Sequence, residues 1–379
     1  MIQLFDFAQK NETWHTIVTN ATCWQKNIFV YDIPQIWVND TIIQFVNLLK
    51  RSRKYDSCLS TSNCDMSFES LDNAWTYTGE LLIMARFLSQ CNIVKKSSEA
   101  DFFVVPFPFA MWQVAGWHVR RHFPNIVADM KKYLIHLNDK TASRHVFFDT
   151  NDSRFIVVNG LSPLVIHSTV VHLGDDKWIS HGLNRKQYFS RSVVVPYRTS
   201  TIKATTFLSE RNILLFGAIN TKRHPVRKKI LQVFENMTEK GVIVKEMNTF
   251  KNLKNTGLIM MNSTYCICPS GDAPSFTQRF YSSVLKGCLP IRVDPYDRFP
   301  VSPYRYPFDW LIDWKTFGIT YKSSEIHKIL PDLYNLEKKG FSAKFRRHIS
   351  HRVNSLSYDL SNDMDASQTA LQEIVTYRE

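Results

Sequence analysis

The sequence predicts an α/β protein built from two Rossmann-like halves, and three observations support this fold class. The chain has 379 residues, and single hydrophobic cores stop growing at roughly 250–300 residues. Short apolar runs alternate with segments of helical periodicity, as in parallel sheets with crossover helices. The alternation restarts in the second half. We therefore expect an N-terminal domain at 1–200, a C-terminal domain at 201–355, and a helix within 356–379 that packs back on the first domain.

The first half contains expected strands and one clear helix. The apolar run at residues 28–31 is closed by Asp32-Ile-Pro34, which marks the end of a strand. Residues 78–89 have the apolar spacing of a helix. Further strands are expected at 100–106, 146–148, 155–158 and 192–196.

The second half repeats this rhythm over a shorter stretch. A strand at 212–216 precedes a basic helix at 225–236. More strands are expected at 241–245, 265–268 and 288–293. Such a succession of strands and helices is typical of a Rossmann-like domain.

The stretch between residues 268 and 290 carries the strongest chemical signal. Ser275 and Gln278 have the spacing of a capping box, which predicts a helix start at Ser275, and Gly287 is placed to end that helix. A helix start carries unpaired N–H groups and a partial positive charge. Arg279 leans toward this start, where its guanidinium can grip a diphosphate. The alternative is an ordinary capped helix with a surface arginine.

Five short motifs occur in the order that they have in the exostosin family, glycosyltransferase family 47. The motif with Tyr265-Cys-x-Cys-Pro-x-Gly-Asp, Arg279 and Gly287-Cys-x-Pro290 resembles the family signature. The other four are Phe29-Val-Tyr-Asp-Ile-Pro34, Tyr77-x-x-Glu80, the strand at 99–107 that ends in Pro-Phe, and the segment at 307–317 that starts with Pro-Phe-Asp. The resemblance implies a GT-B fold with two Rossmann-like domains facing a cleft, inversion at the anomeric carbon, and no metal or other cofactor.

The resemblance also implies the substrates, a UDP-sugar donor and a hydroxyl of an oligosaccharide or glycoprotein glycan. We favour UDP-xylose, because the chain resembles unanchored family members from large algal viruses; UDP-glucuronate and UDP-galactose stay open. The residues implied to bind the donor are Gly217, Arg223, Arg227, Pro269, Ser270, Gly271, Asp272, Ser275 and Arg279. Ser282 stands where the family has an acidic residue. The segment from His145 to Asp152 keeps only the first His and the last Asp of a first-domain motif of the family. These departures favour an alternative, a non-catalytic GT-B module that stabilises a partner transferase.

An inverting transfer needs a general base that takes the proton of the acceptor hydroxyl. We expect the base in the first domain. Asp152 is the first choice, because it follows the end of an expected strand and matches a His-Asp pair of the family. Asp149, His145 and Glu80 are the other candidates. A turn or helix-cap role for Asp152 and a buried ion pair for Glu80 are the structural alternatives.

Charge and hydropathy exclude other classes. The formal net charge is +13, but the basic residues are scattered and not interleaved with aromatic residues, so we expect no nucleic-acid partner. No stretch of 18 or more apolar residues occurs, and the start has no signal-peptide pattern. We therefore expect no membrane span and a cytoplasmic location, with a Golgi-luminal domain as the alternative.

Cysteine and acidic residues give no metal site. The seven cysteines are an odd number, which favours free thiols in a reducing compartment, although Cys58 and Cys64 could pair in an oxidising one. No Cys/His set has zinc spacing. The Asp-x-Asp sequence that ends at Asp365 lies in a polar stretch, where we expect a solvated helix start rather than a metal ligand.

Overall fold

The computed structural model describes residues 24–51, 77–118, 126–150, 161–173, 191–199, 210–222, 224–247, 253–269, 277–294, 306–314, 318–358 and 364–376. The chain divides into two compact units. The first contains the described residues up to Arg198 and those from Tyr358 onward, and the second runs from Thr199 to Ser357. The chain therefore crosses between the units after Arg198 and again after Ser357.

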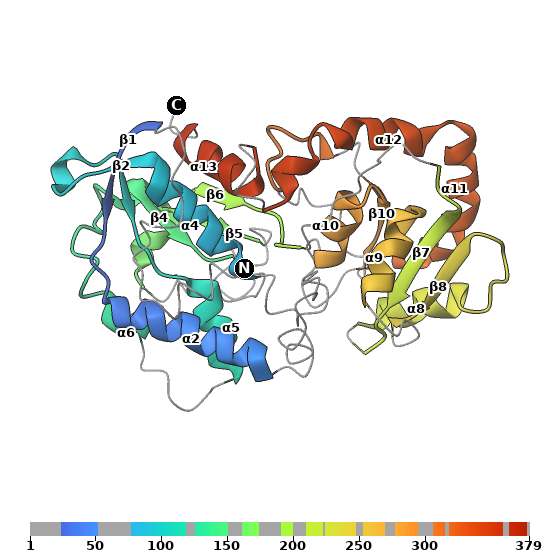
Figure 1. Ribbon diagram of the computed structural model, residues 1–379, viewed down its shortest axis with the longest axis horizontal. Helices are drawn as coiled ribbons and strands as arrows, with labels where there is room; N and C mark the ends of the chain where they lie inside the picture. Colours follow the sequence, from blue (N-terminus) through green and yellow to red (C-terminus); the bar gives the residue numbers. More distant parts are fainter. Residues whose placement is uncertain are drawn as a thin grey trace, which may run out of the picture. The chain divides into compact units, whose positions relative to one another are not determined.

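The first unit is built on a parallel sheet of six strands in the order β2-β1-β3-β4-β5-β6 (Figure 1). Because β2 lies on one side of β1 and β3 on the other, the chain changes direction between β1 and β3. The strands are β1 (Trp24–Val30), β2 (Cys91–Ile93), β3 (Phe102–Val104), β4 (His145–Phe148), β5 (Thr169–His172) and β6 (Arg191–Val194).

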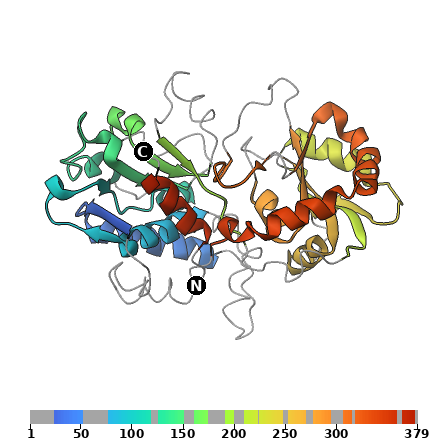
Figure 2. The ribbon, with the colours of Figure 1, turned by 90° about the horizontal axis from the view of Figure 1, so that it is seen from above.

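Helices flank this sheet in two groups. The helices are α2 (Gln35–Arg51), α4 (Gly79–Gln90), α5 (Phe109–His118), α6 (Ile126–Met130) and α13 (Ala366–Thr376). Helix α2 packs on α5, and α4 packs on the C-terminal helix α13 (Figure 2). Helix α5 begins at the strand end that the sequence marked with Pro-Phe, and nearly every side chain of α4 is buried.

The start of α13 corrects one expectation from the sequence. Asp365 was expected in a solvated helix start, but its side chain is fully buried. Its carboxylate accepts hydrogen bonds from the backbone N–H of Gln368 at 2.8 Å and from the hydroxyl of Ser367 at 2.6 Å. The guanidinium of Arg86 lies 3.9 Å away. Asp365 therefore caps α13 against α4 instead of facing water.

The second unit has a parallel sheet of five strands in the order β11-β10-β9-β7-β8. Its strands are β7 (Ile213–Ile219), β8 (Val242–Glu246), β9 (Ser263–Pro269), β10 (Leu289–Asp294) and β11 (Ile319–Lys322). Its helices are α8 (Pro225–Phe234), α9 (Leu253–Met261), α10 (Gln278–Leu285), α11 (Ile329–Lys338) and α12 (Phe341–Ser350). The chain reverses direction between β7 and β9, which are neighbours in the sheet. In open α/β sheets ligands bind at the carboxyl ends of the strands at such a reversal.

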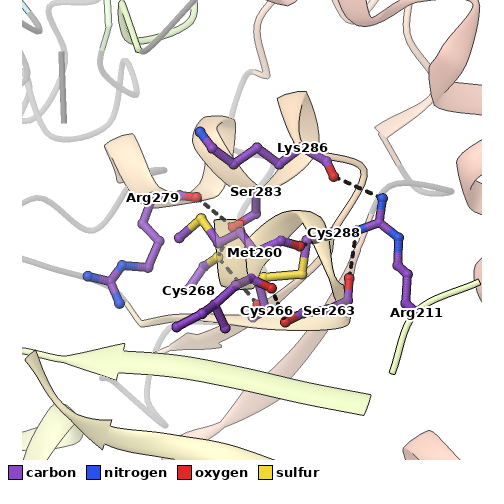
Figure 3. Close-up of a disulfide and its surroundings, with 10 residues drawn as sticks. Arg211, Met260, Ser263, Cys266, Cys268, Arg279, Ser283, Lys286 and Cys288 are labelled. Carbon is purple, nitrogen blue, oxygen red and sulfur yellow. Dashed lines mark hydrogen bonds between the residues drawn. A yellow bond between two sulfur atoms is a disulfide. The ribbon is translucent and has the colours of Figure 1, made fainter. Parts of the chain in front are cut away.

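A single arginine joins several chain segments at the amino ends of these strands. The guanidinium of Arg211 donates hydrogen bonds to the carbonyls of Met260 at 3.1 Å, Ser263 at 2.8 Å and Lys286 at 3.0 Å (Figure 3). These carbonyls lie at the end of α9, the start of β9 and the end of α10. Helix ends leave carbonyls unsatisfied, so the partly buried cation of Arg211 is a suitable partner for them.

We expect Arg211→Ala to lower the free energy of unfolding by about 2 kcal/mol, because three carbonyls lose a charged donor. Urea denaturation of the purified chain, followed by tryptophan fluorescence, measures this change. Arg352→Ala is the matched control, since Arg352 is exposed. Equal stability of the two variants would show that the Arg211 contacts add nothing to the fold.

Candidate functional site

The point where the second sheet reverses direction is bordered by the starts of two helices. Helix α8 follows β7, and α10 follows β9. Pro225 is the first residue of α8, and Nδ1 of His224 accepts a hydrogen bond from the N–H of Val226 at 3.2 Å. Both helix starts therefore lie at the carboxyl ends of neighbouring strands, where partial positive charge accumulates.

The start of α10 differs from the expectation. The predicted start at Ser275 is wrong, because Thr277 is extended, with φ −85° and ψ 160°, and the helix begins at Gln278. The side chain of Thr277 makes no capping hydrogen bond. The end was predicted correctly: Gly287 follows the helix with φ 66°, a left-handed conformation that glycine adopts without strain. Arg279 still lies in the first turn.

The side chain of Arg279 reaches across the carboxyl ends of three adjacent strands. It starts in the first turn of α10, which follows β9. Its guanidinium donates a hydrogen bond to the carbonyl of Ala218, near the end of β7, and contacts Sδ of Met247, just after β8, at 4.0 Å. A fixed cation therefore lies over the reversal point of the sheet, beside the start of α10. This arrangement suits an anion with two phosphate groups.

The other expected donor residues lie in α8, in β7, at the end of β9, or outside the described residues. Arg227 lies in the first turn of α8, with a guanidinium nitrogen 3.5 Å from the carbonyl oxygen of Asn220 in the loop after β7. Pro269 ends β9 and is buried. Gly217 lies inside β7, where an added Cβ would come within 3.1 Å of the side chain of Val244, so packing between strands accounts for this glycine. The expected residues outside the described part of the chain are Arg223, Ser270, Gly271, Asp272 and Ser275.

Glu80 lies at the start of α4 and is fully buried. Its carboxylate accepts hydrogen bonds from the backbone N–H groups of Ala110 at 3.0 Å, Met111 at 2.9 Å and Thr150 at 3.4 Å. The first two belong to the first turn of α5. Glu80 therefore satisfies the open N–H groups of another helix and joins it to the segment after β4. The expected alternative, a buried ion pair, does not describe these contacts.

Burial raises the pKa of Glu80 well above its ordinary value, and the negative charge of Asp149 adds to the rise. The hydrogen bonds from Met111, Ala110 and Thr150 oppose it. Asp149 directly follows β4 and is itself fully buried. Two neighbouring carboxylates repel each other, so a buried pair of carboxyl groups favours the state in which one of them keeps its proton.

His145 lies in the packed face of the first sheet. Its Nε2 is 2.7 Å from the hydroxyl of Tyr31, and its Nδ1 is 2.8 Å from the carbonyl of Thr141. Because a carbonyl only accepts, Nδ1 carries the hydrogen and Nε2 accepts from Tyr31. The ring stacks on Phe103 at 4.8 Å, and burial lowers its pKa to about 4. Both nitrogens are thus engaged inside the core. Asp152, the first choice for the base, lies outside the described residues.

A disulfide joins two strands beside α10. Cys266 of β9 and Cys288, which directly precedes β10, are bonded, with Cα atoms 5.8 Å apart (Figure 3). The expectation of free thiols is therefore wrong for these two residues. Register pairs Cys266 with Pro290, so the two cysteines approach each other only once β9 and β10 are side by side. Cys268, on the same side of β9, keeps its thiol, and burial raises its pKa to about 11.

We expect the Cys266→Ala/Cys288→Ala double variant to be less stable than the natural chain by roughly 3 kcal/mol, the chain-entropy value for a closed loop of this length. The two cysteines are 22 residues apart in sequence. Urea denaturation with and without a reductant measures the difference. The reductant should destabilise the natural chain and leave the double variant unchanged; an equal response in both would contradict a stabilising disulfide.

Comparison with known proteins places this chain in a family. The exostosin GT47 domain model matches residues 22–336, most of the sequence. The chain belongs to the exostosin GT47 family. The motif resemblance that the sequence suggested is therefore confirmed.

Three proteins of Arabidopsis thaliana are similar to this chain. A probable glycosyltransferase is 27% identical over 147 residues, which cover 38% of this chain and 26% of that protein. The probable arabinosyltransferase ARAD1 is 30% identical over 137 residues, covering 35% and 28%. Xyloglucan-specific galacturonosyltransferase 1 is 20% identical over 363 residues, covering 85% and 52%. The chain thus spans about a quarter to a half of the length of these relatives.

Solved glycosyltransferases resemble the chain only distantly. A glycosyltransferase from Rickettsia africae has a TM-score of 0.35 at 11% identity, covering 93% of this chain and 99% of that one. SnogD from Streptomyces nogalater has a TM-score of 0.30 at 10% identity, covering 93% and 99%. The expected fold class, two Rossmann-like α/β units of the GT-B type, is confirmed by the two parallel sheets.

The described part of the chain has neither a membrane-spanning helix nor a cluster of metal-binding residues. No described helix is both long and apolar enough to cross a membrane. No group of three or more His, Cys, Asp or Glu residues gathers at a metal-binding distance among the same residues.

Proposed function

We propose that this chain is an inverting, metal-independent glycosyltransferase that transfers a sugar from a UDP-sugar to a hydroxyl of a glycan. The observation that carries the proposal is the position of Arg279. Its guanidinium lies over the carboxyl ends of β7 and β8 at the point where the sheet reverses direction. The diphosphate of a nucleotide-sugar is the anion that such a position suits in a family of glycosyltransferases.

The same groups supply the electrostatic part of the reaction. When the acceptor oxygen attacks the anomeric carbon, the bond to the phosphate oxygen breaks and UDP leaves with additional negative charge. Arg279, Arg227 and the two helix starts place positive charge at that end of the sheet. Fixed donors and cations that face developing charge lower the barrier, and here they would do so without a metal ion.

The acceptor proton needs a base, which we propose to be Asp152 in the first unit. Glu80 and Asp149 are fully buried, and His145 has both ring nitrogens engaged. Side chains in such positions are suited to stabilising the fold and are less suited to contacting the hydroxyl of an acceptor. Asp152 comes three residues after Asp149, past the end of the same strand, and a carboxylate there would take the proton as the new glycosidic bond forms.

The donor sugar is proposed by analogy and by resemblance. The name of ARAD1 indicates a pentose donor, and that of the xyloglucan-specific relative indicates a hexuronate. UDP-xylose, a pentose donor, is our first choice, and UDP-glucuronate and UDP-galactose are the alternatives. The acceptor is proposed to be an oligosaccharide or a glycan on a glycoprotein.

Ser282 favours a second candidate, a non-catalytic GT-B module that stabilises a partner transferase. It replaces an acidic residue in the family pattern, and its side chain is buried in α10. A module of this kind would bind a partner protein and show no turnover of any donor.

The disulfide also bears on where the chain works. Structural disulfides persist in oxidising compartments and are rare in the cytosol. Because Cys266 and Cys288 are bonded, we propose the lumen of an oxidising compartment, such as the Golgi, over the cytoplasm that the cysteine count suggested. Thiol titration of the chain isolated from its natural source tests this: at least two fewer reactive thiols under denaturing conditions than in a reduced sample are expected.

A panel of nucleotide-sugars tests the proposed function. The melting temperature of the purified chain is measured with UDP-xylose, UDP-glucuronate, UDP-galactose, UDP and CMP, each with magnesium and with EDTA. A donor present at ~100 times its Kd should add about 2.7 kcal/mol to the free energy of unfolding. We expect the UDP compounds to stabilise equally in both buffers. A strict need for magnesium, or equal effects of UDP and CMP, would contradict the proposal.

A further inference from the structure

A short turn beside α10 holds an unusual backbone conformation. It occupies residues 306–314, in the second unit. Phe308 has φ 54°, and among the described residues it is the only non-glycine residue with a positive φ. Such a conformation costs roughly 1–2 kcal/mol and persists only where surrounding contacts impose it. The turn is therefore specified by the fold.

Buried contacts impose this conformation from several directions. The side chain of Phe308 is buried, and its carbonyl accepts hydrogen bonds from the N–H groups of Leu311 and Ile312, both at 2.9 Å. The indole N–H of Trp314 donates to the carbonyl of Pro307 at 2.6 Å. The ring of Tyr306 stacks on Trp314 with centroids 5.2 Å apart. These contacts fix both ends of the turn.

The turn lies against the first turn of α10. The ring of Trp314 is 5.8 Å from the ring of Phe280, the residue directly after Arg279. Phe280, which contacts the turn, and Arg279, which we assign to the diphosphate, are therefore adjacent residues of α10. The turn is therefore packed on the same helix that carries Arg279.

The turn exposes a tryptophan between two acidic residues. Trp310 keeps 47% of its surface exposed, and it is the only exposed one among the tryptophans whose side chains are described. Asp309 and Asp313 are exposed as well. Phe308 and Trp314 are buried and fill the core side of the turn, while Trp310 keeps much of its surface toward solvent.

We propose that Trp310 is a platform for a pyranose ring, with Asp309 and Asp313 accepting hydrogen bonds from its hydroxyls. A pyranose has an apolar face of C–H groups and a rim of hydroxyl donors. An aromatic ring matches the face, and carboxylates match the rim. The proposal rests on the proposed function, since it is the glycosyltransferase site beside the turn that brings sugars there. The ring belongs to the donor sugar or to the acceptor glycan.

The test compares Trp310→Ala with the natural chain and with Leu258→Ala, which removes another exposed apolar side chain of the second unit. Titration calorimetry gives Kd for UDP and for the three UDP-sugars, and an array of oligosaccharides probes glycan binding. Trp310→Ala should leave the UDP affinity unchanged. It should weaken one of two interactions by about 3- to 10-fold: the binding of the UDP-sugars, compared with that of UDP, or the binding of glycans on the array. Trp310→Phe keeps an aromatic ring and should therefore retain most of the sugar affinity of the natural chain.

The outcomes separate the two proposals. Loss confined to the UDP-sugars assigns the platform to the donor sugar, and loss confined to the array assigns it to the acceptor. If Trp310→Ala and Leu258→Ala match the natural chain in both assays, the platform is overturned. If the natural chain does not bind UDP, the proposed function fails, while the array still decides whether Trp310 binds glycans.

Discussion

Arg279→Ala is expected to weaken UDP binding by about 100-fold, which corresponds to about 2.7 kcal/mol. The guanidinium is the one charged group of α10 that reaches the carboxyl ends of β7 and β8. Its removal leaves the diphosphate with the helix start but without a fork of donors. Turnover should fall by at least as much, because the charge on UDP grows as the sugar leaves. Titration calorimetry and a coupled assay of released UDP measure the two effects.

Two further variants sharpen this prediction. Arg279→Lys keeps the charge and loses the two-pronged geometry, so it should lie between the natural chain and Arg279→Ala. Arg347→Ala removes an exposed arginine of α12 and should change nothing. The melting temperature without ligand should be similar for all variants. Unchanged UDP affinity in Arg279→Ala would remove this residue from the donor site.

Glu80→Ala is expected to have the largest effect on stability, a loss of about 5 kcal/mol in the free energy of unfolding. The substitution leaves a cavity and three buried N–H groups without an acceptor, on Ala110, Met111 and Thr150. Glu80→Gln should cost roughly half as much, because its amide oxygen can replace one of the two acceptors. Urea denaturation measures both losses, with the exposed Glu99→Gln as the matched control.

The pH dependence of this effect follows from the raised pKa of Glu80. Burial, reinforced by the charge of Asp149, raises the pKa above the ordinary value of 4.5. The folded chain therefore holds a proton that the unfolded chain releases. The resulting stability is fully present below pH 4.5 and is lost as pH rises through the raised pKa of the folded state. The difference between the natural chain and Glu80→Ala should thus shrink from pH 5 to pH 8, and a difference that grows over this range would contradict the raised pKa.

Much of the fold could be predicted from apolar periodicity. The strands at 28–31, 146–148 and 265–268 were found because buried parallel strands are nearly continuous apolar runs. Helix α5 was missed, since its first residues, Phe109-Ala-Met-Trp, belong to an apolar stretch that was interpreted as a buried strand and a turn, and they show no amphipathic pattern. The expected strand at 155–158 lies outside the described residues.

The position of Arg279 was more predictable from the sequence than the contacts of the other candidate residues. The motif around Arg279 pointed to a diphosphate site, and the structure places this side chain at the reversal of the second sheet. The contact of Glu80 with α5 was not predictable, because it joins residues 30 apart through a helix that the pattern did not reveal. The pairing of Cys266 and Cys288 depends on β9 and β10 being neighbours, which an odd cysteine count cannot indicate.

A crystal structure with UDP bound would show whether Arg279 holds the diphosphate. We expect the diphosphate at the start of α10, between the ends of β7 and β9, with an oxygen of each phosphate within hydrogen-bond distance of the Arg279 guanidinium. UDP bound at another edge of the sheet, or a diphosphate that Arg279 does not contact, would contradict the account.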